Sequence, residues 1–594
     1  MAVQLRSEID DKYKWKLNKI YSTDEEWEEE FKNLKVESPK LQEFSGKLND
    51  KEEILKYFKF SEKVSRNAEK LYVYAHMKCD EDTTNQKYQG MMNRIDGFMA
   101  ELGSYASFFV PEILSLQDGF IEGLLRDDNR FKQYDFLLMD ILKEKPHVLT
   151  KDMEQLLALA SDCLDAPSSI HNMLTNADMT FGDIINEDGE TVELTEGNYS
   201  SFIKSTDRKV RETAFKQLFG EYEKLQNTFA TTLSSSIKSF NFSSRVRKYE
   251  SPLQSSLAPN DIPVSVYENS IKTLNDNMES LHRYVAIKKK LLSLDEIHMY
   301  DLYVPVIETP KDHVEFDDAV KIANAALKPL GEEYLSIFNK GIESGWIDIY
   351  QNKGKRGGAY SWGSYDTMPY VLLNYNYELN DVSTLVHEMG HSLHSYYSRK
   401  EQPYHYADYT LFCAEVASTT NEALLIHYLI DNETDRNKKL YLINQELEQI
   451  RTTVFRQLMF AEFELYTHDA LYKGESLTVE DFNSVWLDLN KKYFGPDMVV
   501  DDEIKIEWAR IPHFYSDYYV YQYATGYAAA SAFANSILKG QENALDKYKG
   551  FLKMGGSKYP IDILKIAGVD MTTSAPLEAT IARFNELLDM LEEL

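Results

Sequence analysis

Two histidines stand four residues apart in the stretch LVHEMGHSLH, residues 385–394 of this 594-residue chain. At helical spacing His387 and His391 project from one face, one turn apart, so both imidazoles can bind one cation. Glu388 lies about 100° further round the helix, where it can contact a water molecule on that cation. The pattern predicts a catalytic metal site, and the alternative is a solvated helix face that carries the same residues.

The sequence around these residues predicts the helix that would position them. It contains no proline, and Asn380 or Asp381 can cap its N-terminus. Gly390 would lie in the helix interior, at a cost of about 1 kcal/mol relative to alanine. We therefore expect a neighbour so close to Gly390 that a side chain has no room.

A catalytic zinc site takes three protein ligands and keeps a fourth position for water. A third histidine at 397 is excluded, because Tyr397 stands there. Glu415 interrupts the apolar run LFCAEVA of a second predicted helix, residues 408–430, and a carboxylate there is costly to bury unless it is paired or metal-bound. Glu415 is therefore the predicted third ligand. Glu422, two turns on, is predicted to orient a ligand histidine, with a surface acid as the alternative.

Composition restricts the class of protein. The formal net charge of −31, from 65 basic and 96 acidic residues, disfavours binding to nucleic acid or to anionic membranes. Three cysteines, without a CxxC pair, are typical of a reducing compartment. The N-terminus has no apolar signal segment and no apolar run is long enough to cross a membrane, so we expect a cytoplasmic protein.

The coarse organisation is predominantly α-helical. The N-terminal third reads as long antiparallel helices, for example over residues 51–79. Asp188-Gly189 between two short β-type runs predicts a hairpin. We place a boundary at this hairpin, which separates an N-terminal helical lobe, residues 1–190, from a catalytic region, residues 191–594. A β-rich segment over residues 297–376 predicts a small sheet just before the metal-binding helix.

HEMGHSLH, followed 28 residues after His387 by EVASTTNE, resembles the thimet oligopeptidase-like gluzincin family of zinc metallopeptidases. The segments KYKWKLNKIYSTDEEWEEEF, DMTFGDI, RGGAYSWG, PYVLLNY and RIPHFYSDYYVYQYATG are also similar, so the resemblance touches most of the chain. It implies a two-lobed helical ellipsoid with a deep substrate channel. It also implies one Zn²⁺ per chain and endoproteolysis of short peptides rather than folded proteins.

The resemblance implies further roles in the tyrosine-rich segment 511–533. A neutral phenol or imidazole can stabilise the oxyanion that forms during peptide hydrolysis, and by motif position His513 and Tyr521 match the family's donors, with Tyr518 a weaker match. The alternative for this segment is an aromatic core helix.

Substrate contacts are expected in the loop and strand before the metal-binding helix. In the resembled family a strand in the place of PYVLLNY is an edge strand that pairs with peptide backbone. Glycines beside it would permit close approach of the peptide. His394 is interpreted as lining the cleft, with a packed structural histidine as the alternative. The predicted substrate-binding residues are Gly357, Gly358, Ala359, Tyr360 and His394.

Two rival functions remain. A dipeptidyl carboxypeptidase would need a cationic group for the terminal carboxylate, and Arg356 and Arg510 are the candidates. The second rival function is that of a non-catalytic peptide-binding protein with a structural zinc. Structural zinc sites are closed by four ligands and are rich in cysteine, which disfavours this alternative. The sequence leaves the oligomeric state open between monomer and dimer.

Overall fold

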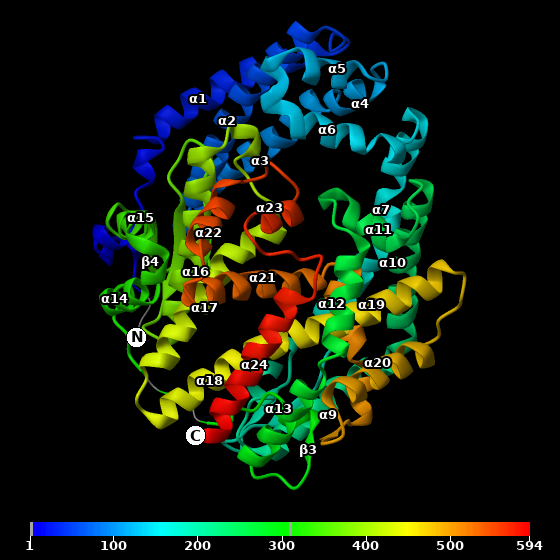
Figure 1. Ribbon diagram of the computed structural model, residues 1–594, viewed down its shortest axis with the longest axis vertical. Helices are drawn as coiled ribbons and strands as arrows, with labels where there is room; N and C mark the ends of the chain where they lie inside the picture. The colour runs from blue at the N-terminus through cyan, green and yellow to red at the C-terminus, as the bar shows by residue number, and fades with distance from the viewer. Residues whose placement is uncertain (1–3, 308–309, 311) are drawn as a thin grey trace. The chain divides into compact units, whose positions relative to one another are not determined.

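The computed structural model describes residues 4–307, 310 and 312–594. Helices dominate these residues, as predicted, and the strands form three small sheets (Figure 1). None of the described helices is both long and apolar enough to cross a membrane.

The chain forms two compact units, each built from three separate stretches of sequence. Unit 1 contains residues 1–146, 311–428 and 533–568, and unit 2 contains the remainder. The predicted division into an N-terminal lobe, residues 1–190, and a catalytic region, residues 191–594, stays a prediction. Units 1 and 2 are defined by the contacts within each of them, and they do not test that division.

Unit 1 carries the predicted metal-binding helices. Its helices are α1 (Asp24–Glu37), α2 (Lys51–Glu81), α3 (Gln86–Ala106), α4 (Phe109–Ser115), α5 (Phe120–Asp127), α6 (Asp135–Lys143), α14 (Phe316–Ala326), α15 (Gly331–Glu343), α16 (Leu379–Glu401), most of α17 (Leu411–Asn432), the end of α21 (Tyr521–Leu538), α22 (Ala544–Lys553) and α23 (Pro560–Ile566). Its strands are β4 (Ile347–Tyr350), β5 (Tyr360–Trp362) and β6 (Tyr370–Tyr375).

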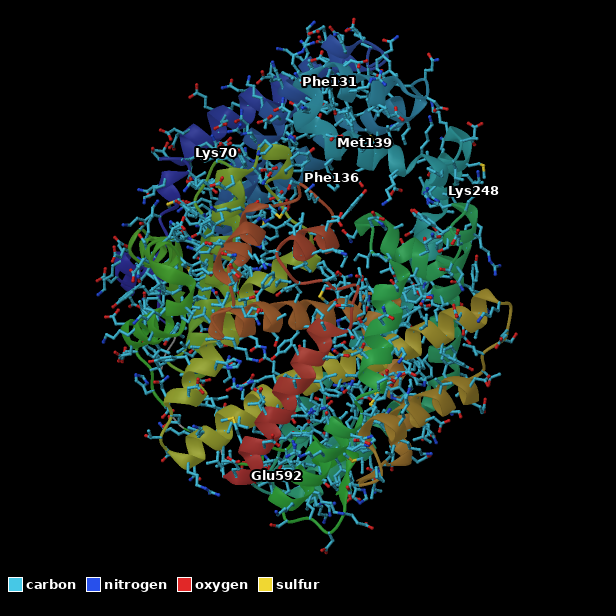
Figure 2. The ribbon with its side chains drawn as sticks, in the orientation of Figure 1. Lys70, Phe131, Phe136, Met139, Lys248 and Glu592 are labelled. Carbon is cyan, nitrogen blue, oxygen red and sulfur yellow. The ribbon has the colours of Figure 1, made fainter. Side chains whose placement is uncertain are left out.

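The strand order in the unit 1 sheet is β4-β6-β5, with β6 parallel to β4 and antiparallel to β5. The expectation that PYVLLNY is an edge strand is therefore wrong, because β6 is paired on both sides. Its residues Tyr370 and Leu372 belong to the apolar core of the N-terminal helices, which also contains Phe131 (Figure 2). Strands β4 and β5 form the two edges of this sheet.

Unit 2 contains the remaining helices and two small sheets. The helices are α7 (Lys151–Met173), α8 (Glu196–Phe202), α9 (Arg208–Lys224), α10 (Gln226–Val246), α11 (Pro252–Leu257), α12 (Val264–Asn275), α13 (Glu279–Leu291), α18 (Arg436–Ile450), α19 (Arg456–Tyr472), α20 (Val479–Phe494), the start of α21 and α24 (Ala575–Glu593). The sheets pair β1 (Asp183–Ile185) with β2 (Thr191–Glu193) and β3 (Ile297–His298) with β7 (Met498–Val499).

The hairpin predicted at Asp188-Gly189 is confirmed. Strands β1 and β2 pair antiparallel, and Gly189 adopts a φ of 78° in the turn between them. A left-handed φ is one that glycine adopts without steric cost. Thr195 then caps α8 and exchanges hydrogen bonds with Asn198 in a capping box.

Candidate metal centre

Helix α16 starts slightly before the predicted position. Glu378 is its N-cap, and the Asp381 carboxylate accepts hydrogen bonds from the main-chain N–H groups of Glu378, at 2.9 Å, and Asn376, at 2.8 Å. The prediction that Asn380 or Asp381 is the cap is therefore wrong, because Asp381 acts as the third helical residue of a capping box. The helix runs without a break through the two histidines.

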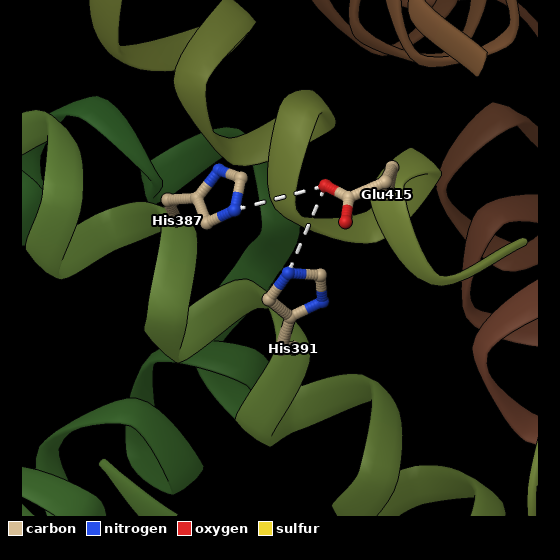
Figure 3. Close-up of side chains that lie close together, drawn as sticks. All are labelled: His387, His391 and Glu415. Atoms are coloured by element: carbon tan, nitrogen blue, oxygen red, sulfur yellow. Dashed lines mark ion pairs between the residues drawn. The ribbon is translucent and has the colours of Figure 1, made fainter. Parts of the chain in front are cut away.

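The structure brings the three predicted metal ligands together (Figure 3). His387 Nε2 and His391 Nε2 lie 3.7 and 3.8 Å from Glu415 Oε2, and one ligand atom from each residue falls within 4.8 Å of the others. Ligands about 2.1 Å from a tetrahedral zinc ion stand about 3.4 Å apart. The two histidine–glutamate distances are therefore a few tenths of an ångström longer than in a tetrahedral zinc site, and the widest spacing of up to 4.8 Å would have to close by about 1.4 Å on binding.

Carboxylates around the site control the protonation of His387. Glu422 Oε2 lies 3.4 Å from His387 Nδ1, on the ring edge opposite the predicted metal. Burial lowers the pKa of His387, but Glu422 and then Glu388 and Glu415 raise it to a net value of about 9. A carboxylate at Nδ1 keeps a proton on that nitrogen and leaves Nε2 for a metal.

Glu388 lies beside the ligands and is only 7% exposed. Burial raises the pKa of its carboxyl to about 7, the charge of His387 opposes this rise, and Glu415 and Glu422 add to it. A carboxyl with a pKa near neutrality can both accept and return a proton.

Helices α16 and α17 approach each other closely at Gly390. A Cβ atom on Gly390 would lie 2.7 Å from Ser418 Cα, so the expected close neighbour is the α17 backbone. The buried side-chain amide of Asn421, on α17, forms hydrogen bonds to both α16 and α15. It donates to the Val386 carbonyl of α16 at 2.9 Å and accepts from the Tyr334 hydroxyl of α15 at 2.9 Å. These contacts set the spacing between the two ligand-bearing helices.

Edge strand β5 lies against the metal-binding helix. The Ser361 hydroxyl is 2.8 Å from that of Ser392, and the nearby main chain of Ser361 lowers the pKa of Glu388 slightly against the effect of burial. The loop before β5 is tied to β6, because the Asn374 amide donates to the Gly358 carbonyl at 2.7 Å. Ser361 and Asn421 were missed by sequence reasoning, although a short β-type run directly after the glycine loop is a signal for the edge strand.

The loop residues predicted to bind substrate differ in accessibility. Gly357 and Gly358 are exposed, and a side chain built on either meets open space. Ala359 is half-buried, and the Tyr360 hydroxyl donates to Asp80 at 2.7 Å. The two glycines, rather than Tyr360, thus offer an open surface in this structure.

His394 packs inside unit 1. It is 1% exposed, and its ring stacks on Tyr409 with centroids 3.6 Å apart. Burial lowers the pKa of His394 to about 3, so the imidazole is neutral. This environment favours the packed structural histidine over a residue that lines the cleft.

All of the tyrosine-rich segment except its last residue, Phe533, belongs to unit 2, whereas the metal ligands belong to unit 1. Tyr518 is 0% and Tyr521 1% exposed, and the Tyr521 ring packs on Tyr267 with centroids 5.0 Å apart. His513 is half-buried, and its Nε2 lies 3.4 Å from the Tyr523 hydroxyl. The structure thus groups His513 with Tyr523 and places Tyr518 and Tyr521 in an aromatic core.

A mostly helical chain with a His-His-Glu donor set and an adjacent buried glutamate has the architecture of a metallopeptidase. Comparisons with known proteins agree with this class. The family model described as peptidase family M3 matches residues 201–583, and the model described as oligopeptidase F matches residues 112–181. The chain belongs to peptidase family M3.

Individual relatives extend the likeness over the full length. Oligopeptidase PepF of Bacillus subtilis is 48% identical over 99% of this chain and 88% of its own length. The crystal structure of oligoendopeptidase-F from Enterococcus faecium is 39% identical, covers 96% of this chain and 99% of its own, and superposes with a TM-score of 0.73. A solved Chlamydophila abortus structure, 36% identical with full coverage of both chains, gives a TM-score of 0.96. The chain is a zinc-dependent metallo-oligopeptidase.

Proposed function

We propose that His387, His391 and Glu415 hold one Zn²⁺ per chain and that Glu388 is the general base for hydrolysis of internal bonds of short peptides. One observation carries the proposal: three donor atoms gather within 4.8 Å beside a buried glutamate. The chemistry supplied by bound zinc is the acidification of a water molecule and the polarisation of the scissile carbonyl.

The protein residues handle the proton. Glu388 removes a proton from the attacking water and delivers it to the leaving amine, which a carboxyl with a pKa of about 7 can do in both directions. Glu422 holds His387 in the tautomer whose Nε2 faces the metal.

Peptide substrates pair with the free edge of β5. An extended peptide added to a sheet edge is held by main-chain hydrogen bonds, which tolerate many sequences. The exposed Gly357 and Gly358 continue this surface. His513 and Tyr521 are proposed as donors to the oxyanion on the basis of motif position, and Tyr518 is less favoured because it is the weaker motif match.

We also propose which partners the protein binds and where it is located. The acidic surface supports short peptides, rather than nucleic acid or membranes, as partners. The three cysteines, Cys79, Cys163 and Cys413, are all free, which supports a reducing cytoplasmic location.

An exopeptidase would need a free cation to bind the terminal carboxylate of its substrate, and both candidate arginines lie near an acidic residue. Arg510 pairs with Glu196 at 2.8 Å, and Arg356 lies 3.5 Å from Asp80. Cleavage of a peptide blocked at both termini separates endopeptidase from exopeptidase activity.

Replacement of Glu388 by glutamine tests the mechanism. The variant should bind one zinc ion, measured by metal analysis, yet lose at least about 100-fold in kcat on a blocked, quenched peptide. The control Glu401→Gln alters an exposed acid at the end of the same helix and should keep full activity. Wild-type turnover by Glu388→Gln contradicts the assignment.

A further inference from the structure

The loop between β4 and β5 is anchored by a buried lysine. Lys355 stands two residues before Gly357, and its side chain is 0% exposed. The ammonium lies 2.7 Å from Asp348 Oδ1, and it donates to the main-chain carbonyls of Asp348, at 3.1 Å, and Tyr350, at 2.8 Å. An ammonium group has three N–H donors. Each of them therefore has an acceptor on β4, and none is left for a substrate.

The carboxylate that pairs with Lys355 is shared with the N-terminal segment. Asp348 is 1% exposed, and Arg6 Nη2 donates to its Oδ2 at 2.6 Å. The same Arg6 nitrogen donates to Glu81 Oε1, at the end of α2, at 3.0 Å. Burial raises the pKa of Asp348, but Lys355 and Arg6 lower it to a net value below the usual range, so this carboxylate is ionised. Two cations and two carboxylates thus form one network between the N-terminal segment, α2, β4 and the loop.

Main-chain hydrogen bonds hold the stem of the loop on both sides of Lys355. The Thr83 N–H donates to the Gly354 carbonyl at 2.7 Å, and the Arg356 N–H donates to the Asp80 carbonyl at 3.0 Å. These bonds do not depend on the charge of the lysine. If that charge is removed, we therefore expect the protein to fold and the loop to become more mobile.

The loop beyond this anchor is the surface at which the proposed peptide binds. Gly357 and Gly358 are exposed, and a Cβ atom on either meets no atom within 4 Å. Glycine loses more conformational freedom than any other residue when it becomes ordered. An attachment close to the two glycines reduces the freedom that a peptide has to remove when it binds.

We propose that Lys355 is a positioning residue, which acts through Asp348 and preorganises the loop of residues 356–359 for peptide binding. Through Arg6, the N-terminal segment takes part in the same task. The inference rests on the proposed function, since it requires a peptide at β5 and this loop. Lys355 itself does not contact the peptide. Loss of the anchor should weaken substrate and transition state equally, which raises KM and leaves kcat unchanged.

The test compares Lys355→Met with Lys353→Met. Methionine keeps a long apolar stem and removes the charge, and Lys353 is an exposed lysine of the same loop. On a blocked, quenched peptide, Lys355→Met should raise KM about tenfold and change kcat by less than about twofold, because the peptide must now order the loop. Lys353→Met should keep the wild-type KM. Both variants should bind zinc as the wild type does.

Trypsin cleavage after Arg356, followed by mass spectrometry, reports on the loop without requiring peptidase activity. Arg356 is exposed, so its cleavage rate depends on how freely the loop opens. Lys355→Met should be cleaved there at least about fivefold faster than the wild type and Lys353→Met. Arg6→Met leaves the Lys355–Asp348 pair in place and should raise KM about threefold.

A wild-type KM in both Lys355→Met and Arg6→Met overturns the inference. A loss confined to kcat or to zinc affinity also overturns it, since a positioning residue for the loop would not act there. If the wild type itself fails to cleave the blocked peptide, the proposed function is refuted instead. The rate of cleavage after Arg356 still shows whether Lys355 anchors the loop.

Discussion

Replacement of Gly390 by alanine should disrupt the metal site without touching a ligand. The new Cβ would lie 2.7 Å from Ser418 Cα and 3.1 Å from the Ala417 carbonyl oxygen. Carbon atoms in contact stand about 3.5–4.0 Å apart, so α16 and α17 must separate by about 1 Å. Glu415 lies less than one turn from Ser418 on α17 and moves with it.

A displacement of about 1 Å is large for a metal ligand, because workable coordination distances hold within about 0.2 Å. We expect zinc affinity to fall about 10–100-fold, as when groups that orient ligands are removed. Overpacking should cost about 1–3 kcal/mol of unfolding free energy. The better helix propensity of alanine offsets about 1 kcal/mol of this cost.

Competition with a fluorescent chelator measures the zinc affinity, and thermal unfolding of the metal-free protein measures the stability. Gly550→Ala is the matched control, because Gly550 lies inside α22 and a Cβ there meets no atom within 4 Å. It should keep wild-type zinc affinity and be at least as stable. Wild-type zinc affinity in Gly390→Ala would refute the argument that this contact sets the ligand spacing.

Three further changes probe the protein groups around the metal. Tyr521→Phe should lower kcat about 100-fold with little change in KM, and an unchanged kcat removes Tyr521 from the mechanism. Glu422→Gln should weaken zinc about 10–100-fold yet retain most of kcat at saturating zinc; equal affinity would contradict its orienting role. Zinc affinity should rise about tenfold per pH unit between pH 6 and 8, because His387, with a pKa of about 9, must release a proton to bind. A flat profile in the chelator assay would show that His387 is already neutral.

The parts of the site that depend on local spacing could be predicted from sequence. His387 and His391 share a face because a helix repeats every 3.6 residues. Glu415 was identified because it interrupts an apolar run, but the expected burial is wrong, since its side chain is 49% exposed and only its place beside the two histidines supports the assignment. Gly390 signalled a close approach, and the structure identifies the α17 backbone as the neighbour.

The parts that depend on pairing between distant segments could not be predicted. The sequence of β6 fits either an edge or a central strand, and only its partners β4 and β5 settle the order. The cap of α16 was misplaced because Asp381 favours both the N-cap and the third helical position. The sequence could not decide whether His394 lines the cleft or packs in the interior, because its stacking partner Tyr409 belongs to a later segment of the chain.

The aromatic-core interpretation of the tyrosine-rich segment applies to Tyr518 and Tyr521, whereas His513 lies outside that core. Tyr518 has the left-handed φ of 58°, and its N–H donates to the buried Glu464 at 3.0 Å, so its place in the core is fixed by backbone as well as by packing. Tyr521 is 1% exposed and its ring packs on Tyr267, so it can donate to a substrate only after a change that makes its hydroxyl accessible. His513 needs no such change, because it is half-buried and burial lowers its pKa, which keeps the imidazole neutral at pH 7.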